Sequence, residues 1–316
     1  MKNKKIKFGV VGVGYLGKHH VKHLSQFPFI ELVGIHDINQ QSLLEVAKKY
    51  SAKPYDSIDQ LLSQIDAVSI VTPTNQHAAV ANKALENNCH IFIEKPITNS
   101  IESANSILQN TINQNKVAHV GHIERFNPAF RALLAQNPNP LFVESHRLTK
   151  INDRSMDISV VLDLMIHDID LLIHIINSPI KNIIADGISV ISNSIDLANV
   201  KLIFSNGAVA NLTASRISNK DMRKMRIFEN KKYTSVDLLN RELVEYSTDS
   251  IQKEALTFNH KNIKVKDYDA LALELTHFCD CIIKNDKSNQ NIKNAIIALT
   301  IAQQINDMIK SKKATQ

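Results

Sequence analysis

The chain has 316 residues, of which 44% are hydrophobic and 22% charged, and this composition excludes an intrinsically disordered chain. Its 37 basic and 31 acidic side chains leave a formal charge of only +6, which does not indicate a nucleic-acid-binding protein. The three cysteines are too few for a disulfide framework, so we expect a reducing, cytoplasmic compartment.

The first predicted elements are a strand, a glycine-rich turn and a helix, in the segment IKFGVVGVGYLGKHH. Gly12, Gly14 and Gly17 give the spacing G-x-G-x-x-G, which permits a tight turn, close approach of a pyrophosphate and close packing of helix on strand. The next strand, ELVGIHD, ends at Asp37, where an acidic side chain typically bonds a ribose 2′-hydroxyl. Because a carboxylate repels a 2′-phosphate, we expect NAD rather than NADP as the cofactor.

Helices and strands continue to alternate up to about residue 122. Helices are predicted at 41–50, 77–88 and 103–115, and strands begin near 66, 89 and 116. This alternation predicts a doubly wound parallel sheet, a Rossmann domain over residues 1–122. Ligands of such sheets bind beyond the carboxyl ends of the strands, where the chain has the loops GVGYLG, HDIN, TPTNQH, EKP and GHIERFN.

Lys95 lies in one of these loops, between Glu94 and Pro96. A lysine that faces a cofactor from a strand end can polarise a substrate hydroxyl or carbonyl group. The alternative is an exposed lysine before a turn proline. The neighbouring residues do not separate these two interpretations.

After about residue 122 the pattern changes to one helix, at roughly 157–177, followed by a series of strands. The strands are predicted in the segments NIIADGISVI, LANVKLIFS, AVANLTASRI, KMRIFEN, YTSVDLL and ELVEYS, and the SNG segment at 205–207 is typical of a hairpin turn. Two helices end the chain. We therefore expect an α+β domain at 123–316 with an open, mainly antiparallel sheet, and the terminal helices are candidates to pack back on the first domain.

The helix predicted before these strands is mostly apolar, yet it carries three carboxylates. Asp163, His167, Asp170 and His174 are spaced so that they fall within about 60° of one another on an α-helix. Asp168 lies away from this line and is expected to be a cap or an ion-pair partner. The narrow stripe favours a helix that faces a cofactor. The alternatives are a stripe that merely touches water and a metal site, for which no third ligand is evident, so no metal is expected.

Four segments, in their order along the chain, resemble the Gfo/Idh/MocA oxidoreductases. They are the glycine motif at 12–17, TPTNQH at 72–77, EKP at 94–96 and DLMIHDID at 163–170. GHIERFNPAF and SVVLDLMIHDID are also similar to a narrower group, the UDP-N-acetylglucosamine 3-dehydrogenases, which oxidise the sugar C3 hydroxyl for a partner aminotransferase. The chain departs from many family members in having ISVVL, without glycines, just before Asp163.

The resemblance implies a dehydrogenase of the EC 1.1.1 type that oxidises a secondary hydroxyl of a sugar, with C3 of UDP-N-acetylglucosamine as the first candidate. It implies three catalytic residues: His167 as the leading base, Asp163 to orient it and Lys95 to polarise the oxygen, although Lys95 and His167 could exchange roles. It also implies a homodimer or homotetramer paired through the sheet of the second domain. The implied cofactor-binding residues are Gly12, Gly14, Tyr15, Leu16, Gly17, Asp37, Thr72, Pro73, Asn75, His77, Glu94 and Lys95. The implied substrate-binding residues are Lys95, Arg125, Asn127, Asp163 and His167.

Three functions remain open at this point. The first is an NAD-dependent nucleotide-sugar dehydrogenase, and the second is a dehydrogenase of the same family that acts on a free sugar, a cyclitol or another small substrate. Arg125 could separate them, because it could hold a diphosphate, although it could equally be a structural arginine. The third is a non-catalytic NAD-dependent sensor, which the presence of Lys95, Asp163 and His167 disfavours.

Overall fold

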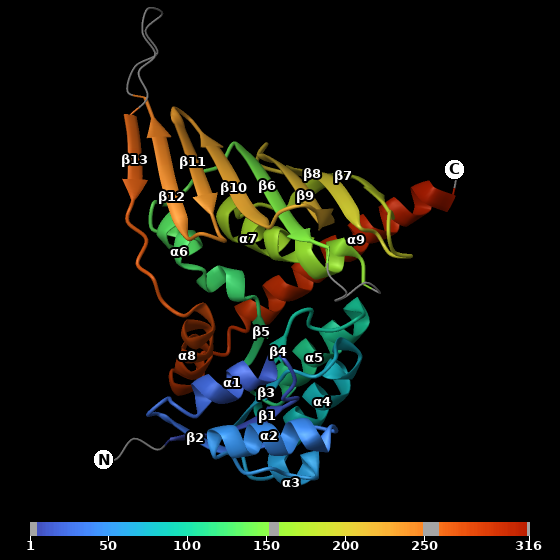
Figure 1. The fold of residues 1–316 in the computed structure, drawn as a ribbon, viewed down its shortest axis with the longest axis vertical. Coiled ribbons are helices and arrows are strands. Elements are labelled where there is room, and N and C mark those ends of the chain that lie inside the picture. Colours follow the sequence, from blue (N-terminus) through green and yellow to red (C-terminus); the bar gives the residue numbers. More distant parts are fainter. Residues whose placement is uncertain (1–4, 152–157, 249–258, 315–316) are drawn as a thin grey trace, which may run out of the picture. The chain divides into compact units, whose positions relative to one another are not determined.

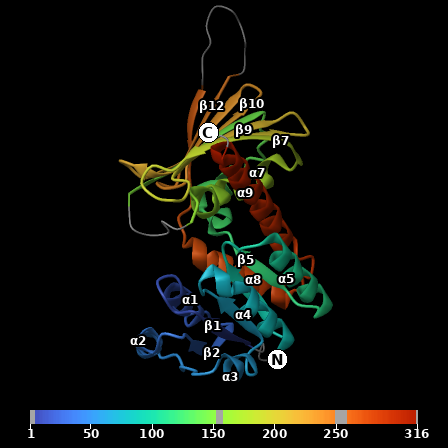
Figure 2. The same ribbon diagram turned by 90° about the vertical axis from the view of Figure 1, so that its right-hand side faces the viewer.

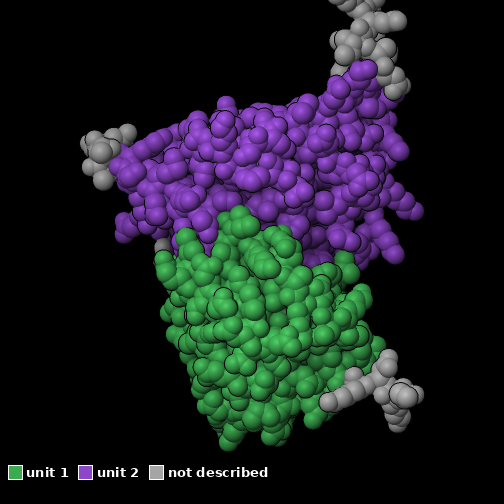
Figure 3. All heavy atoms as spheres, turned by 180° about the vertical axis from the view of Figure 1, so that it is seen from behind, with its two compact units in different colours: residues 1–122, 271–297 green, residues 123–270, 298–316 purple. Residues whose placement is uncertain are grey.

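The structure is a computed structural model and describes residues 5–151, 158–248 and 259–314, so position 157 of the predicted helix lies outside the described residues. The chain divides into two compact units (Figure 3). Unit 1 comprises residues 1–122 and 271–297, and unit 2 comprises residues 123–270 and 298–316. Unit 1 therefore combines the first part of the chain with a segment from near its end.

Unit 1 is built on a five-stranded, wholly parallel sheet with the strand order β2-β1-β3-β4-β5 (Figure 1). Its strands are β1 (Ile6–Val11), β2 (Ile30–His36), β3 (Ala67–Ile70), β4 (His90–Glu94) and β5 (Ala118–Gly121). Its helices are α1 (Gly17–Leu24), α2 (Gln40–Tyr50), α3 (Ile58–Leu62), α4 (Thr74–Glu86), α5 (Ile101–Asn113) and α8 (Ala270–Ile283). The predicted doubly wound sheet is confirmed, and its strand order reverses beside β1, which is where such sheets bind ligands.

Helices cover both faces of this sheet, with α1 and α2 on one side and α4 and α5 on the other (Figure 2). Helix α8 joins α1 and α2, because its Phe278 meets the rings of Phe8 and Phe92 edge to face at centroid distances of 6.0 and 5.8 Å. Burying three aromatic rings in one cluster fixes the position of α8 on the sheet.

The free edge of β5 is closed by two asparagine side chains. Asn289 Oδ1 accepts a hydrogen bond from the N–H of Ala118 at 3.2 Å, and Asn291 Oδ1 accepts one from Val120 at 2.7 Å. An open strand edge would otherwise present these donors to another chain. These two N–H groups of the edge strand therefore have hydrogen-bond partners within unit 1.

Unit 2 is built on an eight-stranded sheet with the order β13-β12-β11-β10-β6-β9-β8-β7 (Figure 1). Its strands are β6 (Phe142–Lys150), β7 (Ile180–Ile188), β8 (Leu197–Phe204), β9 (Val209–Ser218), β10 (Met222–Glu229), β11 (Lys232–Asp237), β12 (Glu242–Ser247) and β13 (Asn259–Ile263). Its helical segments are a 3₁₀ turn (Ile123–Phe126), α6 (Pro128–Leu134), a π-helical turn (Val161–Met165), α7 (Ile166–Ile176) and the later part of α9 (Gln290–Ala314).

The sheet of unit 2 is mainly antiparallel, as predicted, except that its two central strands β6 and β9 are parallel. The six predicted strands are present, and the predicted turn joins β8 to β9 with Gly207 at φ +90°. Strands β6 and β13 were not predicted. The prediction of a regular α-helix from about residue 157 is wrong, because residues Val161–Met165 form a π-helical turn before α7.

One face of this sheet carries the core of unit 2, against which α6, α7 and α9 pack. The other face carries a row of rings on five neighbouring strands, with consecutive centroids 5.0 to 5.9 Å apart. These rings belong to Phe142, Phe228, Tyr233, Tyr246 and His260. No helix in the described ranges combines the length and the apolar character that a membrane span requires.

His90, at the start of β4, makes the stability of unit 1 depend on pH. Its Nδ1 accepts a hydrogen bond from the N–H of Val117 at 2.9 Å, and burial together with the charge of Lys116 lowers its pKa to about 4. A lowered pKa means that the stabilisation is complete above about pH 6.5 and is lost as the pH falls towards 4. We expect the melting temperature to fall less between pH 7 and pH 5 in His90→Asn, which keeps an acceptor but cannot titrate, than in the wild type.

The matched control is His19→Asn, because His19 is exposed. Its melting temperature should follow the wild-type pH profile. A His90→Asn profile parallel to that of the wild type would contradict the role given to His90.

Candidate functional site: a dinucleotide cavity in unit 1 and a polar turn in unit 2

The carboxyl ends of β1, β2, β3 and β4 surround a cavity of about 980 Å³ in unit 1. This volume lies at the upper end of the range of about 300–1,000 Å³ that is typical of small-molecule sites. Of the predicted cofactor-binding residues, all line the cavity except Tyr15 and Gly17. Tyr15 is exposed instead, and Lys18 Nζ lies 4.9 Å from the centroid of its ring.

The three glycines of the turn after β1 differ in what a Cβ atom at each position would contact. Gly12 has φ +89°, and a Cβ there would lie 2.5 Å from the carbonyl oxygen of Val71. A Cβ on Gly17 would collide with the carbonyl oxygen of Gly12. A Cβ on Gly14 would meet no atom within 4 Å, so nothing in the fold itself requires glycine there. Gly14 instead leaves open space at the cavity wall, which fits a backbone that a pyrophosphate approaches.

Helix α1, which follows the glycine turn, is the second element that can face the phosphates. The first turn of α1 begins after Leu16, which provides no side-chain cap for the backbone N–H groups. The N–H groups of Lys18 and His19 donate to the carbonyl oxygens of Gly14 and Leu16, so the positive end of the helix dipole is what favours an anion here. The turn and the start of α1 therefore fit the diphosphate of a dinucleotide.

Asp37, just after β2, is held in place by two backbone donors. Its Oδ2 accepts from the N–H of Val13 at 2.7 Å, and its Oδ1 accepts from the N–H of Asn39 at 2.8 Å. A carboxylate has further lone pairs, so Asp37 can still accept hydrogen bonds from ribose hydroxyls. The next residue, Ile38, lines the same cavity and is 91% exposed. Its side chain is therefore suited to cover the flat face of a base of the dinucleotide. The sequence analysis missed Ile38, although its position directly after Asp37 could have signalled it.

The backbone of Lys95 is bonded to the Glu94 side chain, which begins a chain of three polar groups that continues through His20 to Ser69. Its N–H donates to Glu94 Oε2 at 3.2 Å, Glu94 Oε1 lies 3.1 Å from His20 Nε2, and His20 Nδ1 lies 2.8 Å from Ser69 Oγ. Burial acts to raise the pKa of Glu94, but the hydrogen bonds from His20 and from the N–H of Lys95 outweigh it and lower the pKa. The charged carboxylate thus fixes the backbone at Lys95. Nothing in the sequence signals that His20 meets Glu94.

His77 joins two of the loops that line the cavity. Its Nε2 lies 2.9 Å from the carbonyl oxygen of Thr72, and its Nδ1 lies 3.0 Å from that of Pro96, across the end of the EKP loop. Burial lowers the pKa of His77, although the carbonyl oxygens that face both of its ring nitrogens act to raise it. His77 therefore contributes to the shape of the cavity through the loops that it connects.

In unit 2, Asp163 and His167 lie at the junction of the π-helical turn and α7, and both are half-buried. A π-helical turn holds more residues than an α-helical turn, so Asp163 is displaced from the line predicted for a regular helix. Such turns occur frequently at functional sites.

Asp168 was expected to be a cap or an ion-pair partner, and in the structure it is an ion-pair partner. Both of its oxygens accept hydrogen bonds from Arg147, from Nε and Nη2, each at 2.9 Å. Arg147 also donates to Glu124 Oε1 at 2.8 Å, and all three side chains are buried. Burial acts to lower the pKa of Arg147, but the two carboxylates raise it, so its charge is permanent. This is a structural cluster.

Asp170 forms a second buried pair, with Arg125. Arg125 Nε donates to Asp170 Oδ2 at 2.7 Å and Nη2 donates to Oδ1 at 2.5 Å, a bidentate geometry that uses one side of the guanidinium. The neighbouring Asn127 caps α6 through Ala129 and donates to the carbonyl oxygen of Leu238. These contacts favour the structural interpretation of Arg125 over that of a diphosphate ligand.

No cysteine has the low pKa of a nucleophile. Burial raises the pKa of the Cys89 thiol to about 11 and that of Cys279 to about 12, and it also raises the pKa of Cys281. The chemistry of the site therefore depends on oxygen and nitrogen groups.

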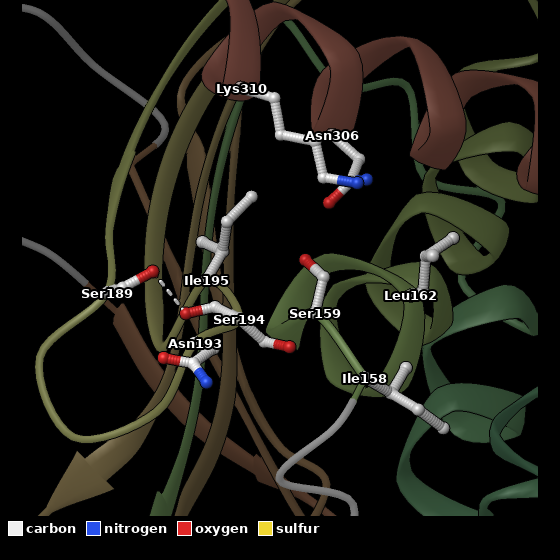
Figure 4. A pocket seen from close by; sticks show the side chains of 9 residues that line it. All are labelled: Ile158, Ser159, Leu162, Ser189, Asn193, Ser194, Ile195, Asn306 and Lys310. Carbon is white, nitrogen blue, oxygen red and sulfur yellow. Dashed lines mark hydrogen bonds between the residues drawn. The ribbon is translucent and has the colours of Figure 1, made fainter. Parts of the chain in front are cut away.

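A second cavity, of about 360 Å³, lies in unit 2 between α9, the loop before β8 and the start of the π-helical turn (Figure 4). Asn306 and Lys310 reach it from α9, opposite Ser159 and Ile195. It contains none of the predicted site residues.

The glycine turn, the carboxylate at the end of β2 and the lysine at the end of β4 define an NAD-binding oxidoreductase. The family model described as "Oxidoreductase family, NAD-binding Rossmann fold" matches residues 6–122, and the model of the GFO/IDH/MocA C-terminal domain matches residues 130–232. The chain belongs to the Gfo/Idh/MocA family. The predicted family, enzyme class and NAD cofactor are thereby confirmed.

Individual relatives agree with this assignment. The chain is 36% identical over 279 residues to the UDP-N-acetylglucosamine 3-dehydrogenase of Acidithiobacillus ferrooxidans, covering 88% of each chain. A solved structure of the enzyme from that organism matches with a TM-score of 0.91 and 33% identity over 97% of this chain and 98% of that one. The scyllo-inositol 2-dehydrogenase (NAD(+)) of Bacillus subtilis is 26% identical over 90% of this chain and 87% of its own length.

The contrast between Gly14 and Gly12 gives a test of the cavity. We expect Gly14→Ala to keep the melting temperature of the cofactor-free protein but to weaken NAD binding at least tenfold, because its methyl group enters the space that the pyrophosphate approaches. The measurements are thermal unfolding without cofactor and calorimetric titration with NAD.

Gly12→Ala is the comparison variant, and it should lower the melting temperature itself, because of its positive φ and its contact with Val71. A Gly14→Ala protein that binds NAD as tightly as the wild type would show that the diphosphate lies elsewhere.

Proposed function

We propose that the chain oxidises the C3 hydroxyl of UDP-N-acetylglucosamine to the 3-keto sugar, with NAD as the hydride acceptor. The observation that carries the proposal is the similarity, at 36% identity over 88% of both chains, to an enzyme of that name. The GHIERFNPAF and SVVLDLMIHDID segments of the sequence support the same group.

The proposed mechanism assigns three roles to residues of this chain. His167 takes the proton of the C3 hydroxyl, since histidine is the side chain that most often acts as a general base. Asp163, one turn earlier, orients the imidazole and stabilises its charged form. Lys95 donates to the same oxygen as it becomes a ketone, which stabilises developing negative charge. NAD, when bound, supplies the acceptor for the hydride that leaves C3.

The alternative assignment exchanges Lys95 and His167. The backbone anchor of Lys95 on Glu94 supports a fixed position for the lysine, which suits either polarisation or proton transfer.

A second candidate substrate is a free sugar or a cyclitol. The bidentate Arg125–Asp170 pair favours it, because the arginine expected to hold a diphosphate already has a buried carboxylate. A scyllo-inositol dehydrogenase among the relatives, at 26% identity, supports the same alternative.

The chain is further proposed to act as a homodimer or homotetramer that pairs through the outer face of the unit 2 sheet, and to work in the cytoplasm. The row of rings on that face supports self-association, since apolar surface on a sheet commonly marks an interface. An aminotransferase that consumes the keto sugar is the proposed pathway partner.

A substrate panel tests the proposed function. We expect reduction of NAD, followed by the absorbance of NADH, with a higher kcat/KM for UDP-N-acetylglucosamine than for other UDP-sugars, free sugars and inositols. His167→Asn, which is expected to lower turnover by about 10²–10⁴, serves as the control for contaminating activity. Turnover of inositols without turnover of any UDP-sugar would contradict the proposal and favour the second candidate.

Asp37 gives a test of coenzyme preference. We expect Asp37→Ser to raise kcat/KM with NADP relative to NAD, because the carboxylate that repels the 2′-phosphate is removed. Asp56→Ser is the matched control, since it removes an exposed charge of unit 1 that does not line the cavity. A wild-type enzyme that prefers NADP in steady-state kinetics would show that Asp37 does not select the coenzyme.

A further inference from the structure

Three side chains of unit 1 that take no part in the dinucleotide cavity converge at the edge of its sheet. His119 lies on β5, and His277 and Cys281 lie on α8. Each offers one ligand atom, and these atoms all lie within 4.8 Å of one another. Within the described ranges, no other group of three or more histidine, cysteine or acidic side chains comes together in this way.

The fold fixes His119 more firmly than a surface histidine. Its ring is buried and stacks on Phe92 at a centroid distance of 5.9 Å and an angle of 18°, and it meets Phe278 edge to face at 5.8 Å. These contacts set the plane of the imidazole, which then meets His277 at right angles with centroids 5.3 Å apart.

Helix α8 supplies the other two groups with helical spacing. His277 and Cys281 are four residues apart, so they lie on the same face of the helix, and Cys281 Sγ is 3.9 Å from His277 Nδ1. Leu275, Phe278 and Cys279 lie in the hydrophobic core of unit 1, and Cys281 packs against the same core. Cys279 is two residues from Cys281 and so lies roughly 160° away from it around the helix, which leaves Cys279 out of the cluster.

The distances are close to those of a metal site. A tetrahedral zinc ion has bonds of about 2.0–2.1 Å to nitrogen and about 2.3 Å to sulfur, which places its ligand atoms roughly 3.3–3.7 Å apart. The sulfur and the His277 nitrogen lie 3.9 Å apart and all three ligand atoms lie within 4.8 Å, so the ligands must close by up to about 1 Å to reach this geometry. His277 is exposed, so its side chain is able to turn towards the other two ligands.

We propose that His119, His277 and Cys281 form a binding site for a zinc ion, with water as the fourth ligand. On binding, the thiol proton of Cys281 passes to the buffer as the sulfur–zinc bond forms, and both histidines bind as neutral rings. Two nitrogens and one thiolate are a set that Zn²⁺ accepts readily and that Mg²⁺ and Ca²⁺ do not. The ion crosslinks α8, from near the end of the chain, to the edge strand of the parallel sheet.

The experiment uses the full chain without an affinity tag, first stripped of metal with a chelator. Titration with Co²⁺ should give one equivalent of binding and a thiolate-to-cobalt charge-transfer band in the near ultraviolet, and Zn²⁺ should abolish the band by competition. Cys281→Ser should lose the band. His277→Ala should weaken Zn²⁺ binding by at least the roughly 10–100-fold that loss of even an outer-shell partner costs.

Cys89→Ser is the matched control, because Cys89 is a buried thiol in the same unit whose hydrogen bonds to carbonyl oxygens a serine can replace. It should keep the band and the affinity, and circular dichroism should show that all variants are folded. Zn²⁺ should also raise the melting temperature of the wild type and of Cys89→Ser, but not of Cys281→Ser. Absence of stoichiometric binding, or equal Zn²⁺ affinity in wild type and Cys281→Ser, would overturn the proposal.

Discussion

The arrangement of unit 2 depends on two buried arginines that neutralise the carboxylates of α7. Asp168 and Asp170 enter an apolar core, where an unpaired charge costs several kcal/mol. Arg147 holds Asp168 together with Glu124, and Arg125 holds Asp170 in a bidentate pair. Because these carboxylates have fixed partners, the helix can be apolar around most of its circumference and still carry three acidic residues. Asp163 and His167, on the first turns, are outside these two ion pairs and are the groups to which the proposed mechanism gives proton transfer.

In unit 1, hydrogen bonds likewise hold the polar groups at the carboxyl ends of the strands. The glycine turn omits side chains where a phosphate must approach, and backbone N–H groups hold Asp37 in one orientation. Lys95, to which the proposed mechanism gives the polarising role, has its backbone N–H bonded to Glu94, which is in turn bonded to the buried His20. A cationic side chain on a fixed backbone loses less freedom when it binds an oxygen atom, which suits a group that must stabilise a transition state.

The parts of the molecule that were predictable from sequence are those with local signals. The spacing of Gly12, Gly14 and Gly17 and the position of Asp37 located the cavity, because the turn and the next strand end are adjacent in a parallel sheet. Asp168 was expected to be a cap or an ion-pair partner because it falls off the polar line of a regular helix. The turn at Gly207 was predicted from its residue types alone.

The remaining features depend on contacts that no short segment reveals. Arg125 meets a partner 45 residues away, so its local sequence ERFN could not separate a structural arginine from a ligand. Strand β6 was missed because its charged and polar residues hide the alternation and because its central partner β9 runs parallel to it from a distant part of the chain. The π-helical turn was missed because a helical spacing argument assumes 3.6 residues per turn.

The most direct test of this division between structural and reactive carboxylates compares Asp163→Asn with Asp168→Asn, measuring the free energy of unfolding and kcat for each. We predict that Asp163→Asn changes the stability by less than about 1 kcal/mol and lowers kcat by about 10²-fold or more. Asp168→Asn should instead lower the stability by about 3 kcal/mol or more, since it leaves Arg147 with an incompletely compensated buried charge. A stable and inactive Asp168→Asn protein, together with an unstable Asp163→Asn protein that keeps its activity, would contradict the account.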